Sequence, residues 1–560
     1  MVPTVSTLHV PRGGTMRGRV SPLVPELGGV DRSRPRAAGR EPRAGVPTAS
    51  RRRRAASVVS SLAAAAFWLT AVSSAAQPVA PPAGQQPAPP PTAASPVAPT
   101  RVAPPITQRP TAGVDPERLA RVDEIVEAAI TAGNMPGAVA LAGHRGRLVY
   151  RKAFGQRAVA PAAEPMTLDT IFDAASLTKV VATTTAVMML VEEGKVGLDD
   201  KISTYFKETP DSWKDVTIRQ LLSHTAGFTD YPRDFNFRED YTEDQLLKKA
   251  MTIPLAFPPG EKWQYSNMGY VTLGILIGKV TGSFYGDFLQ ERIFRPLGMS
   301  ATRIINETDI IPNRAAGYRL VKGEVKNQGW VSPTMNTTAD GSLYFTILDV
   351  AKWDAALYTE KLLKRSSLQL MWTPVKLNDG KPNRAGYGFG WRIGDIRGHR
   401  IVEHAGAWQG FTSNISRYVD DKLTVVVLTN LAGANPESIT HHVAGLYDAA
   451  LMPLPEIPIE DKEPQVTALL GDLLQKIADG KADPALFTPD LQKELFPDTI
   501  KEFEGTLKEW GQRKSIALLQ RREEEGNRVY RYRIVFERMS VALELVLTAD
   551  NKVAGLRVSQ

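Results

Sequence analysis

Two kinds of hydrophobic pattern follow one another along this chain. Short apolar runs at 137–143 and 147–152, separated by His144-Arg145-Gly146, predict a β-hairpin. Residues 181–190 form an apolar run suited to a buried helix, and residues 195–340 are mostly helical in pattern, with Pro and Gly between the helices. Strand-like patterns then return at 387–393, 401–411 and 423–429. Amphipathic helices are predicted at the two ends, over 115–132 and 437–451. The pattern therefore favours an antiparallel sheet of five or more strands flanked by helices, with an all-α insertion.

A second unit follows the break at Pro453-Leu454-Pro455 and covers about 462–560. The expected helices are 465–478, 490–496 and 498–510, and the expected strands are 515–521, 528–536, 541–548 and 553–558. Helices on one face of an antiparallel meander suggest an α+β accessory domain of cystatin- or NTF2-like type. No catalytic constellation is visible in it, which favours a packing or substrate-lid role.

The basic excess of this chain is confined to its N-terminal segment. The 560 residues carry a net charge of +8, but residues 1–76 hold 12 Arg and 3 acidic residues, so the remainder is close to neutral. A basic surface for binding nucleic acid is therefore not expected on the folded part. The chain has no cysteine, which excludes disulfides, thiolate nucleophiles and cysteine metal sites.

The N-terminal segment has the pattern of an export signal. Arg51–Arg54 precede the apolar stretch 55–70 and a small-residue junction at Ala76/Gln77. An uncleaved membrane anchor is the alternative, although the apolar stretch is short for a membrane span. The Pro/Ala-rich residues 77–112 are expected to form an extended linker, before a main domain over 113–455. The predicted location is therefore periplasmic or extracellular, close to a membrane or cell wall.

Chemistry is suggested first by Ser176-Leu177-Thr178-Lys179 at the start of the buried helix. A serine and a lysine three residues apart share one helical face, so the two side chains can meet. A neutral amine can take the proton of a hydroxyl nucleophile, provided that burial or a nearby cation lowers the lysine pKa. Alone, the motif also fits a helix-capping serine beside a solvated lysine.

Two later motifs make that simpler interpretation improbable. Tyr265-Ser266-Asn267 follows Pro258-Pro259-Gly260, and His404-Ala405-Gly406 lies in a strand-like run. In this order, S-x-x-K, Y-x-N and H-x-G resemble the motif set of the penicillin-recognising serine hydrolases. The segments 216–228 and 294–299 resemble two further sequence motifs of this family, and the resemblance covers about 115–455. Its nearest branch holds class C β-lactamases, serine DD-carboxypeptidases, D-aminopeptidases, family VIII esterases and LACTB-like filament-forming proteins.

The resemblance implies an α/β (α+β) fold of β-lactamase/transpeptidase type and assigns roles to particular residues. Ser176 would be the nucleophile that forms an acyl-enzyme, with Lys179 and Tyr265 sharing the proton transfers and the choice of base left open. Asn267 would bind substrate and accept a hydrogen bond from Lys179. The backbone N–H groups of Ser176 and Ala407 would form the oxyanion hole, and Gly406 would keep the strand edge clear.

His404 departs from the pattern of penicillin-directed members, which usually carry Lys there. A mostly neutral imidazole should weaken recognition of an anionic β-lactam. The expected activity is hydrolysis of an ester or amide in a small-molecule or peptide substrate, of which D-amino-acid and peptidoglycan-derived compounds are examples. A β-lactamase or DD-carboxypeptidase is the alternative enzyme, and a catalytically silent binding or assembly protein is the non-enzymatic alternative. His224 and His144 are interpreted as structural, and no metal, nucleotide or other cofactor is implied.

Overall fold

The computed structural model describes residues 116–232, 235–304, 309–321, 323–453, 456–524, 526–538 and 540–559. The predicted signal region 1–76 and linker 77–112 lie outside the described residues.

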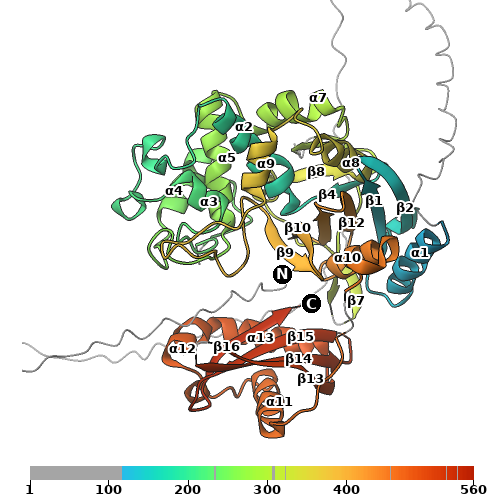
Figure 1. Cartoon of the computed structure of the whole chain (residues 1–560), viewed down its shortest axis with the longest axis vertical. Coiled ribbons are helices and arrows are strands. Elements are labelled where there is room, and N and C mark those ends of the chain that lie inside the picture. The colour runs from blue at the N-terminus through green and yellow to red at the C-terminus, as the bar shows by residue number, and fades with distance from the viewer. Residues whose placement is uncertain are drawn as a thin grey trace, which may run out of the picture. The chain divides into compact units, whose positions relative to one another are not determined.

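The main domain is built on a seven-stranded sheet (Figure 1). Its order is β3 (Glu164–Pro165), β2 (Arg147–Ala158), β1 (Gly137–His144), β12 (Leu423–Thr429), β11 (Phe411–Tyr418), β10 (His399–Trp408) and β9 (Arg392–Ile396). Every pair of neighbours is antiparallel. The hairpin predicted near the N-terminus, β1–β2, joins the late strands through β12, which explains why strand-like patterns occur at both ends of the domain. The expected antiparallel sheet is therefore confirmed.

Helices cover both faces of this sheet. Helices α1 (Pro116–Thr131) and α10 (Pro436–Tyr447) pack together on one face, where α10 contacts β11 and β12. Helix α8 (Ile347–Ala356) packs against β1 and β12. Because it is covered on both sides, β12 is buried at every position and reads Leu-Thr-Val-Val-Val-Leu-Thr without polar alternation.

A largely helical region is inserted between the strands. Its longer helices are α2 (Thr185–Glu192), α4 (Glu243–Met251) and α5 (Asn267–Thr281), and its short ones are α3 (Ile218–Leu222), α6 (Tyr285–Leu289), α7 (Arg295–Leu297) and α9 (Arg365–Met371). Two π-helical segments, Lys179–Thr184 and Gln290–Phe294, occur here as well. Short 3₁₀ turns of this region lie at Ile202–Thr204, Asp211–Trp213 and Pro333–Asn336. Two more follow later in the chain, at Ala449–Leu451 and Pro484–Leu486. Minor sheets comprise β4 (Ile171–Asp173), β8 (Leu343–Thr346) and β5 (Arg303–Ile304) in one, and β6 (Tyr318–Val321) and β7 (Glu324–Asn327) in the other.

Sequence signals explain where the helix that follows the Tyr-Ser-Asn motif begins and ends. Ser266 is the N-cap of α5, and its hydroxyl accepts a hydrogen bond from the backbone N–H of Gly269 at 3.2 Å. The helix ends at Gly282, which adopts a left-handed conformation with φ 76°. Asn267 therefore occupies the first turn of a rigid, mostly buried helix.

The strand predicted over 387–393 is wrong in its first half. Residues 387–391 form a bent loop, and the regular strand is β9, which begins at Arg392. Gly390 has φ 78°, and a Cβ at Gly388 would lie 2.2 Å from the carbonyl oxygen of Met371. Glycines at these two positions permit a tight, irregular path that alternation of apolar residues cannot reveal.

The C-terminal unit has its own hydrophobic core, made of residues between Val466 and Leu556. It contains α11 (Pro464–Ala478), α12 (Pro489–Leu495), α13 (Asp498–Trp510) and a four-stranded meander. The strands are β13 (Arg513–Glu524), β14 (Asn527–Phe536), β15 (Ser540–Leu547) and β16 (Val553–Ser559), each paired antiparallel with the next. The predicted helices and meander are present, whereas the domain boundaries and the cystatin- or NTF2-like assignment stay predictions.

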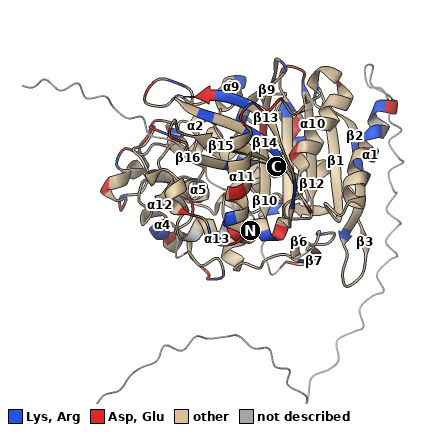
Figure 2. Ribbon diagram, turned by 90° about the horizontal axis from the view of Figure 1, so that it is seen from below, with Lys and Arg blue, Asp and Glu red and all other residues tan. Residues whose placement is uncertain are grey.

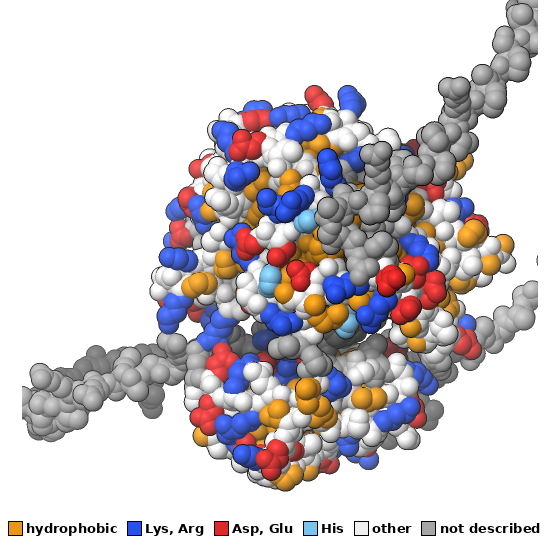
Figure 3. Space-filling model, turned by 45° about the vertical axis from the view of Figure 1, so that its right-hand side comes forward, with side chains coloured by type: hydrophobic (Ala, Val, Ile, Leu, Met, Phe, Trp, Pro, Cys, Tyr) orange, Lys and Arg blue, Asp and Glu red, His pale blue; other side chains and the backbone are white. Residues whose placement is uncertain are grey.

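Charged residues of both signs are interspersed along the described chain. Figure 2 shows Lys, Arg, Asp and Glu scattered over the described elements, and Figure 3 shows a face on which charged and hydrophobic side chains are mixed. Among the described residues, no helix is both long and apolar enough to cross a membrane.

Candidate active site

Ser176 lies on a tight turn between β4 and the π-helical segment that begins at Lys179. Asp173 accepts a hydrogen bond from the backbone N–H of Ala175 at 2.8 Å, and Ala175 adopts a left-handed φ of 48°. The Thr178 hydroxyl donates to the Ala175 carbonyl at 2.6 Å and accepts from the Leu343 N–H at 2.9 Å. A non-glycine residue with positive φ stores strain of roughly 1–3 kcal/mol, which such surrounding bonds must offset. The turn is therefore fixed, with Ser176 partly exposed among buried neighbours.

Lys179 is fully buried and makes three polar contacts through its ammonium nitrogen. Nζ lies 3.1 Å from Ser176 Oγ, 2.7 Å from Asn267 Oδ1 and 2.6 Å from the backbone oxygen of Asp340. Burial lowers the pKa of Lys179 to about 8, although the nearby carboxylates of Asp340 and Asp230 act in the opposite direction. A lysine that titrates here has a useful neutral fraction near neutral pH.

Tyr265 stands beside this pair. Lys179 Nζ lies 5.0 Å from the centre of its ring. Burial raises the pKa of the Tyr265 phenol well above its ordinary value, and the neighbouring Ser176 hydroxyl acts in the opposite direction. The phenol therefore stays protonated at neutral pH, whereas a fraction of the lysine is already neutral there.

Asn267 is held from both sides of its amide. Its oxygen accepts from Lys179, and its Nδ2 donates to Asp230 Oδ2 at 3.2 Å. Asp230 also accepts from the Asn267 backbone N–H at 2.9 Å. One amide hydrogen of Asn267 has no partner in these bonds, so it is available for a substrate.

The strand that carries the His-x-Gly motif lies directly against the Ser176 turn. A Cβ built on Gly406 would lie 2.6 Å from the Ala174 oxygen and 2.4 Å from Ser413 Oγ, and Ser413 Oγ donates to the same Ala174 oxygen at 3.2 Å. The segments bearing the two predicted oxyanion donors, the N–H groups of Ser176 and Ala407, are thus adjacent.

His404 is buried and has partners for both ring nitrogens within the protein. Nδ1 lies 2.6 Å from the Ala405 oxygen and Nε2 lies 2.9 Å from the Tyr387 hydroxyl. A carbonyl can only accept, so Nδ1 carries the proton and the Tyr387 hydroxyl donates to Nε2. Burial, with the positive charge of Lys179, lowers the pKa of His404 to about 3. The imidazole is therefore neutral, in line with the sequence argument, and acquires no charge even in mildly acidic solution.

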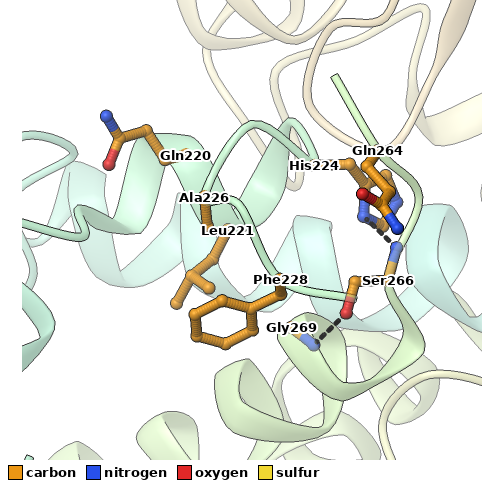
Figure 4. A pocket seen from close by; sticks show the side chains of 8 residues that line it. All are labelled: Gln220, Leu221, His224, Ala226, Phe228, Gln264, Ser266 and Gly269. Carbon is orange, nitrogen blue, oxygen red and sulfur yellow. Dashed lines mark hydrogen bonds between the residues drawn. The ribbon is translucent and has the colours of Figure 1, made fainter. Parts of the chain in front are cut away.

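His224 belongs to the support of this site, although the sequence suggested only a structural residue at a helix end. It follows α3, its Nδ1 accepts from the Ser266 backbone N–H at 3.2 Å, and its ring lies 4.2 Å from that of Tyr265. Figure 4 shows its side chain beside Gln264, lining a shallow pocket to which Ser266 also contributes. His144 lies in the β1–β2 turn region, with its ring 5.2 Å from that of Tyr447.

Four residues of the site were not singled out from sequence: Asp230, Tyr231, Asp340 and Tyr387. Tyr231 donates to Asp340 Oδ2 at 2.9 Å, and the Asp340 backbone oxygen binds Lys179. They come from irregular segments outside the motifs, and the backbone contact leaves no trace in residue identity. Only the proximity of Asp230 and Tyr231 to the 216–228 segment could have indicated them.

One group among the described residues has the geometry to hold a metal ion: Glu403, Glu437 and His441. Arg392 already forms ion pairs with both glutamates, and His441 Nε2 lies 2.8 Å from Glu403 Oε2. The guanidinium supplies the positive charge that a cation would bring, so the group is better explained as an ion-pair network.

A family model described as Beta-lactamase matches residues 122–448. The chain belongs to the beta-lactamase family. The sequence-based resemblance is thereby confirmed, together with the fold, and the family is one of serine hydrolases that act through an acyl-enzyme.

Relatives of this chain carry names from several branches of the family. The chain is 32% identical over 308 residues to penicillin-binding protein 4* of Bacillus subtilis, and the match covers 52% of this chain and 67% of that protein. It is 31% identical over 268 residues to a putative D-alanyl-D-alanine carboxypeptidase of Escherichia coli O157:H7, covering 45% of this chain and 58% of that protein. The solved D-amino acid amidase of Ochrobactrum anthropi SV3 is similar with a TM-score of 0.52 and 25% identity, covering 60% of this chain and 98% of that one. The chain thus spans only about three fifths to two thirds of the two sequence relatives.

Close packing at Gly406 yields a test of the site. Gly406→Ala should lower kcat/KM for a simple ester by roughly ten- to a hundredfold, because the new methyl group must push β10 away from the Ser176 turn. Gly505→Ala in α13 is the matched control, since a Cβ there meets nothing within 4 Å. Steady-state kinetics with thermal unfolding of both variants measure the effect, and equal kinetics for the two would contradict the proposed contact.

Proposed function

We propose that this chain is an active serine hydrolase that cleaves ester or amide bonds through an acyl-enzyme on Ser176. The observation that carries the proposal is the set of three oxygen partners around Lys179 Nζ. Asn267 Oδ1 and the Asp340 carbonyl can only accept hydrogen bonds, so two N–H bonds of a neutral lysine must point at them. The remaining position, which holds the lone pair, then faces Ser176 Oγ at 3.1 Å.

Lys179 is accordingly the proposed base. Neutral Lys179 takes the Ser176 proton as Oγ bonds to the substrate carbonyl carbon, and the N–H groups of Ser176 and Ala407 stabilise the resulting oxyanion. Tyr265, held protonated by burial, donates its proton to the leaving oxygen or nitrogen as the scissile bond breaks, and the proton on Lys179 replaces it. A water molecule then attacks the acyl-enzyme by the same steps in reverse and releases Ser176.

Neutral substrates suit the His404 end of the site better than anionic ones. The imidazole is uncharged, and its two nitrogens are engaged by Ala405 and Tyr387. The chain therefore offers no fixed cation where penicillin-directed relatives usually carry Lys. An esterase, D-aminopeptidase or peptidoglycan-related amidase activity is preferred on this ground over a β-lactamase or DD-carboxypeptidase activity.

Export remains part of the proposal. The Arg51–Arg54 cluster, the apolar stretch 55–70 and the Ala76/Gln77 junction support it, and the relatives named penicillin-binding protein and carboxypeptidase are consistent with it.

The nucleophile is tested directly. Ser176→Ala should abolish turnover of p-nitrophenyl acetate and labelling by a fluorophosphonate probe, because no other side chain in this scheme can hold the acyl group. Mass spectrometry of the labelled wild-type protein locates the adduct. An adduct on another residue, or an unlabelled wild-type protein, would contradict the assignment, the latter in favour of a silent binding protein.

The role of Lys179 predicts a pH profile. Its neutral form is the active one and forms as the pH rises through a pKa of about 8. Below that value, log kcat/KM for a neutral ester should rise with unit slope, roughly tenfold per pH unit, and then level off above it. Lys179→Arg should abolish the activity at all pH values, since a guanidinium keeps its proton. A rate that falls as the pH rises through 8 would contradict the assignment of Lys179 as base.

Substrate charge provides a third test. An acetyl ester of methyl 4-hydroxybenzoate should be cleaved roughly five- to tenfold faster, in kcat/KM, than the acetyl ester of 4-hydroxybenzoate, whose leaving group bears a carboxylate. The ratio should stay constant from pH 7.5 to 5.5, because the pKa of His404 is about 3. The contribution of Lys179 is common to both esters and cancels. A rising relative rate for the anion towards pH 5.5 would show that His404 becomes charged.

A further inference from the structure

A cluster of aromatic rings lies beside the proposed catalytic residues. The ring centres of Tyr231 and Phe237 are 4.8 Å apart, and each lies about as far from Phe235, at 4.7 and 5.1 Å. Phe237 in turn lies 5.9 Å from Trp408, the last residue of β10. Tyr231, Phe237 and Trp408 are only partly buried, so their rings form a wall that remains accessible. We call these three residues the aromatic wall.

The aromatic wall is connected to the catalytic residues at both ends. At one end the Tyr231 hydroxyl binds the Asp340 side chain, and the backbone oxygen of Asp340 binds Lys179. At the other end Trp408 follows Ala407, and the alternation of a strand places its side chain on the same face as Gly406. Gly406 is the residue that abuts the Ser176 turn. The wall therefore extends from the site itself.

Trp330 adds an exposed ring near this wall. Its side chain is 64% exposed, which is unusual for so large an apolar group. Its loop is tethered on both sides to the wall's own segments. The Ser332 N–H donates to the Phe237 carbonyl at 2.8 Å, and Gln328 Nε2 donates to Gln409 Oε1 at 3.4 Å, next to Trp408. The two anchors hold this exposed ring beside the aromatic wall, so it can extend the apolar surface that the wall offers to a ligand.

The orientation of the substrate along β10 follows from the position of the residue that protonates the leaving group. The leaving group must receive its proton from Tyr265, whose ring lies 6.3 Å from that of His404. The leaving group therefore points towards the His404 end of β10. The two substituents of a carbonyl carbon held at Ala407 extend in opposite directions, so the acyl group points towards Trp408.

We propose that the aromatic wall, with Trp330, selects substrates whose acyl group carries an aromatic ring. This inference rests on the proposed function, because it needs an acyl-enzyme on Ser176. Offset or edge-to-face contact with the rings of Phe237 and Trp408 favours an aromatic acyl group over a saturated ring of similar size. The aromatic contact acts on the acylation step, and kcat/KM reports the steps up to acylation, so the selectivity should appear in kcat/KM.

Three p-nitrophenyl esters with one leaving group test the proposal: the phenylacetate, the cyclohexylacetate and the acetate. After division by the rate of spontaneous hydrolysis of each ester, the wild-type protein should prefer phenylacetate to cyclohexylacetate by roughly three- to tenfold in kcat/KM. Phe237→Leu and Trp330→Ala should each reduce this preference by a factor of about three or more. Phe284→Ala, at a partly exposed ring that packs on Tyr285 at the start of α6, should leave the preference and the rates unchanged.

Each outcome decides between the possibilities. Equal rates for the aromatic and saturated acyl groups, or a preference that survives both Phe237→Leu and Trp330→Ala, would overturn the aromatic wall as a selector. Phe237→Leu preserves an apolar side chain of similar size, and Trp330→Ala changes an exposed position, so both variants should fold. Turnover of all three esters by Ser176→Ala would instead refute the proposed function, whatever the acyl preference.

Discussion

The burial of one ammonium group among three oxygen atoms is the constraint on which the site depends. Lys179 lies at the start of a π-helical segment inside the core, where a charged form is costly and its pKa falls to about 8. One partner, Ser176, lies in the adjoining turn, and the other two come from distant parts of the chain, namely the first turn of α5 and the backbone at Asp340. The nitrogen thus joins these segments as well as preparing the hydroxyl. Loss of any partner would leave a buried polar group unpaired.

Around this centre the fold provides two kinds of support. The strand β10 lies next to the edge strand β9 of the main sheet and pairs along residues 401–408 with β11, which fixes the position of Gly406 and Ala407. The helical insertion supplies Tyr265 and Asn267 through the capped start of α5, with His224 packed behind Tyr265. Neutral imidazoles at His224 and His404 therefore surround the phenol with polar but uncharged groups.

Much of this arrangement could be predicted from the sequence because the motifs lie on regular elements. The hairpin β1–β2, the strands β10 and β12 and the whole C-terminal unit follow from local periodicity. Helical spacing brings Ser176 and Lys179 together, but the approach of Tyr265 and Asn267 to this pair follows only from family resemblance, since nothing local links Lys179 to Asn267, 88 residues away. The loop at Tyr387 was mistaken for a strand because its alternation is regular and its two glycines act through distant backbone contacts. Asp340 could not be found at all, since its contribution to Lys179 is a backbone carbonyl that any residue type would provide.

Packing between β10 and the Ser176 turn also limits how this site can evolve. A Cβ at Gly406 would sit 3.2 Å from the Cβ of Ala175, so these two positions share a volume that is already full. Ala175 itself has a left-handed backbone that disfavours any larger or branched side chain. Enlargement at either position can therefore be accepted only after the other segment has moved, and that movement would separate the proposed oxyanion donors. We expect the two positions to behave in evolution as a single unit that is fixed for size, while the residues of the aromatic wall are free to diversify.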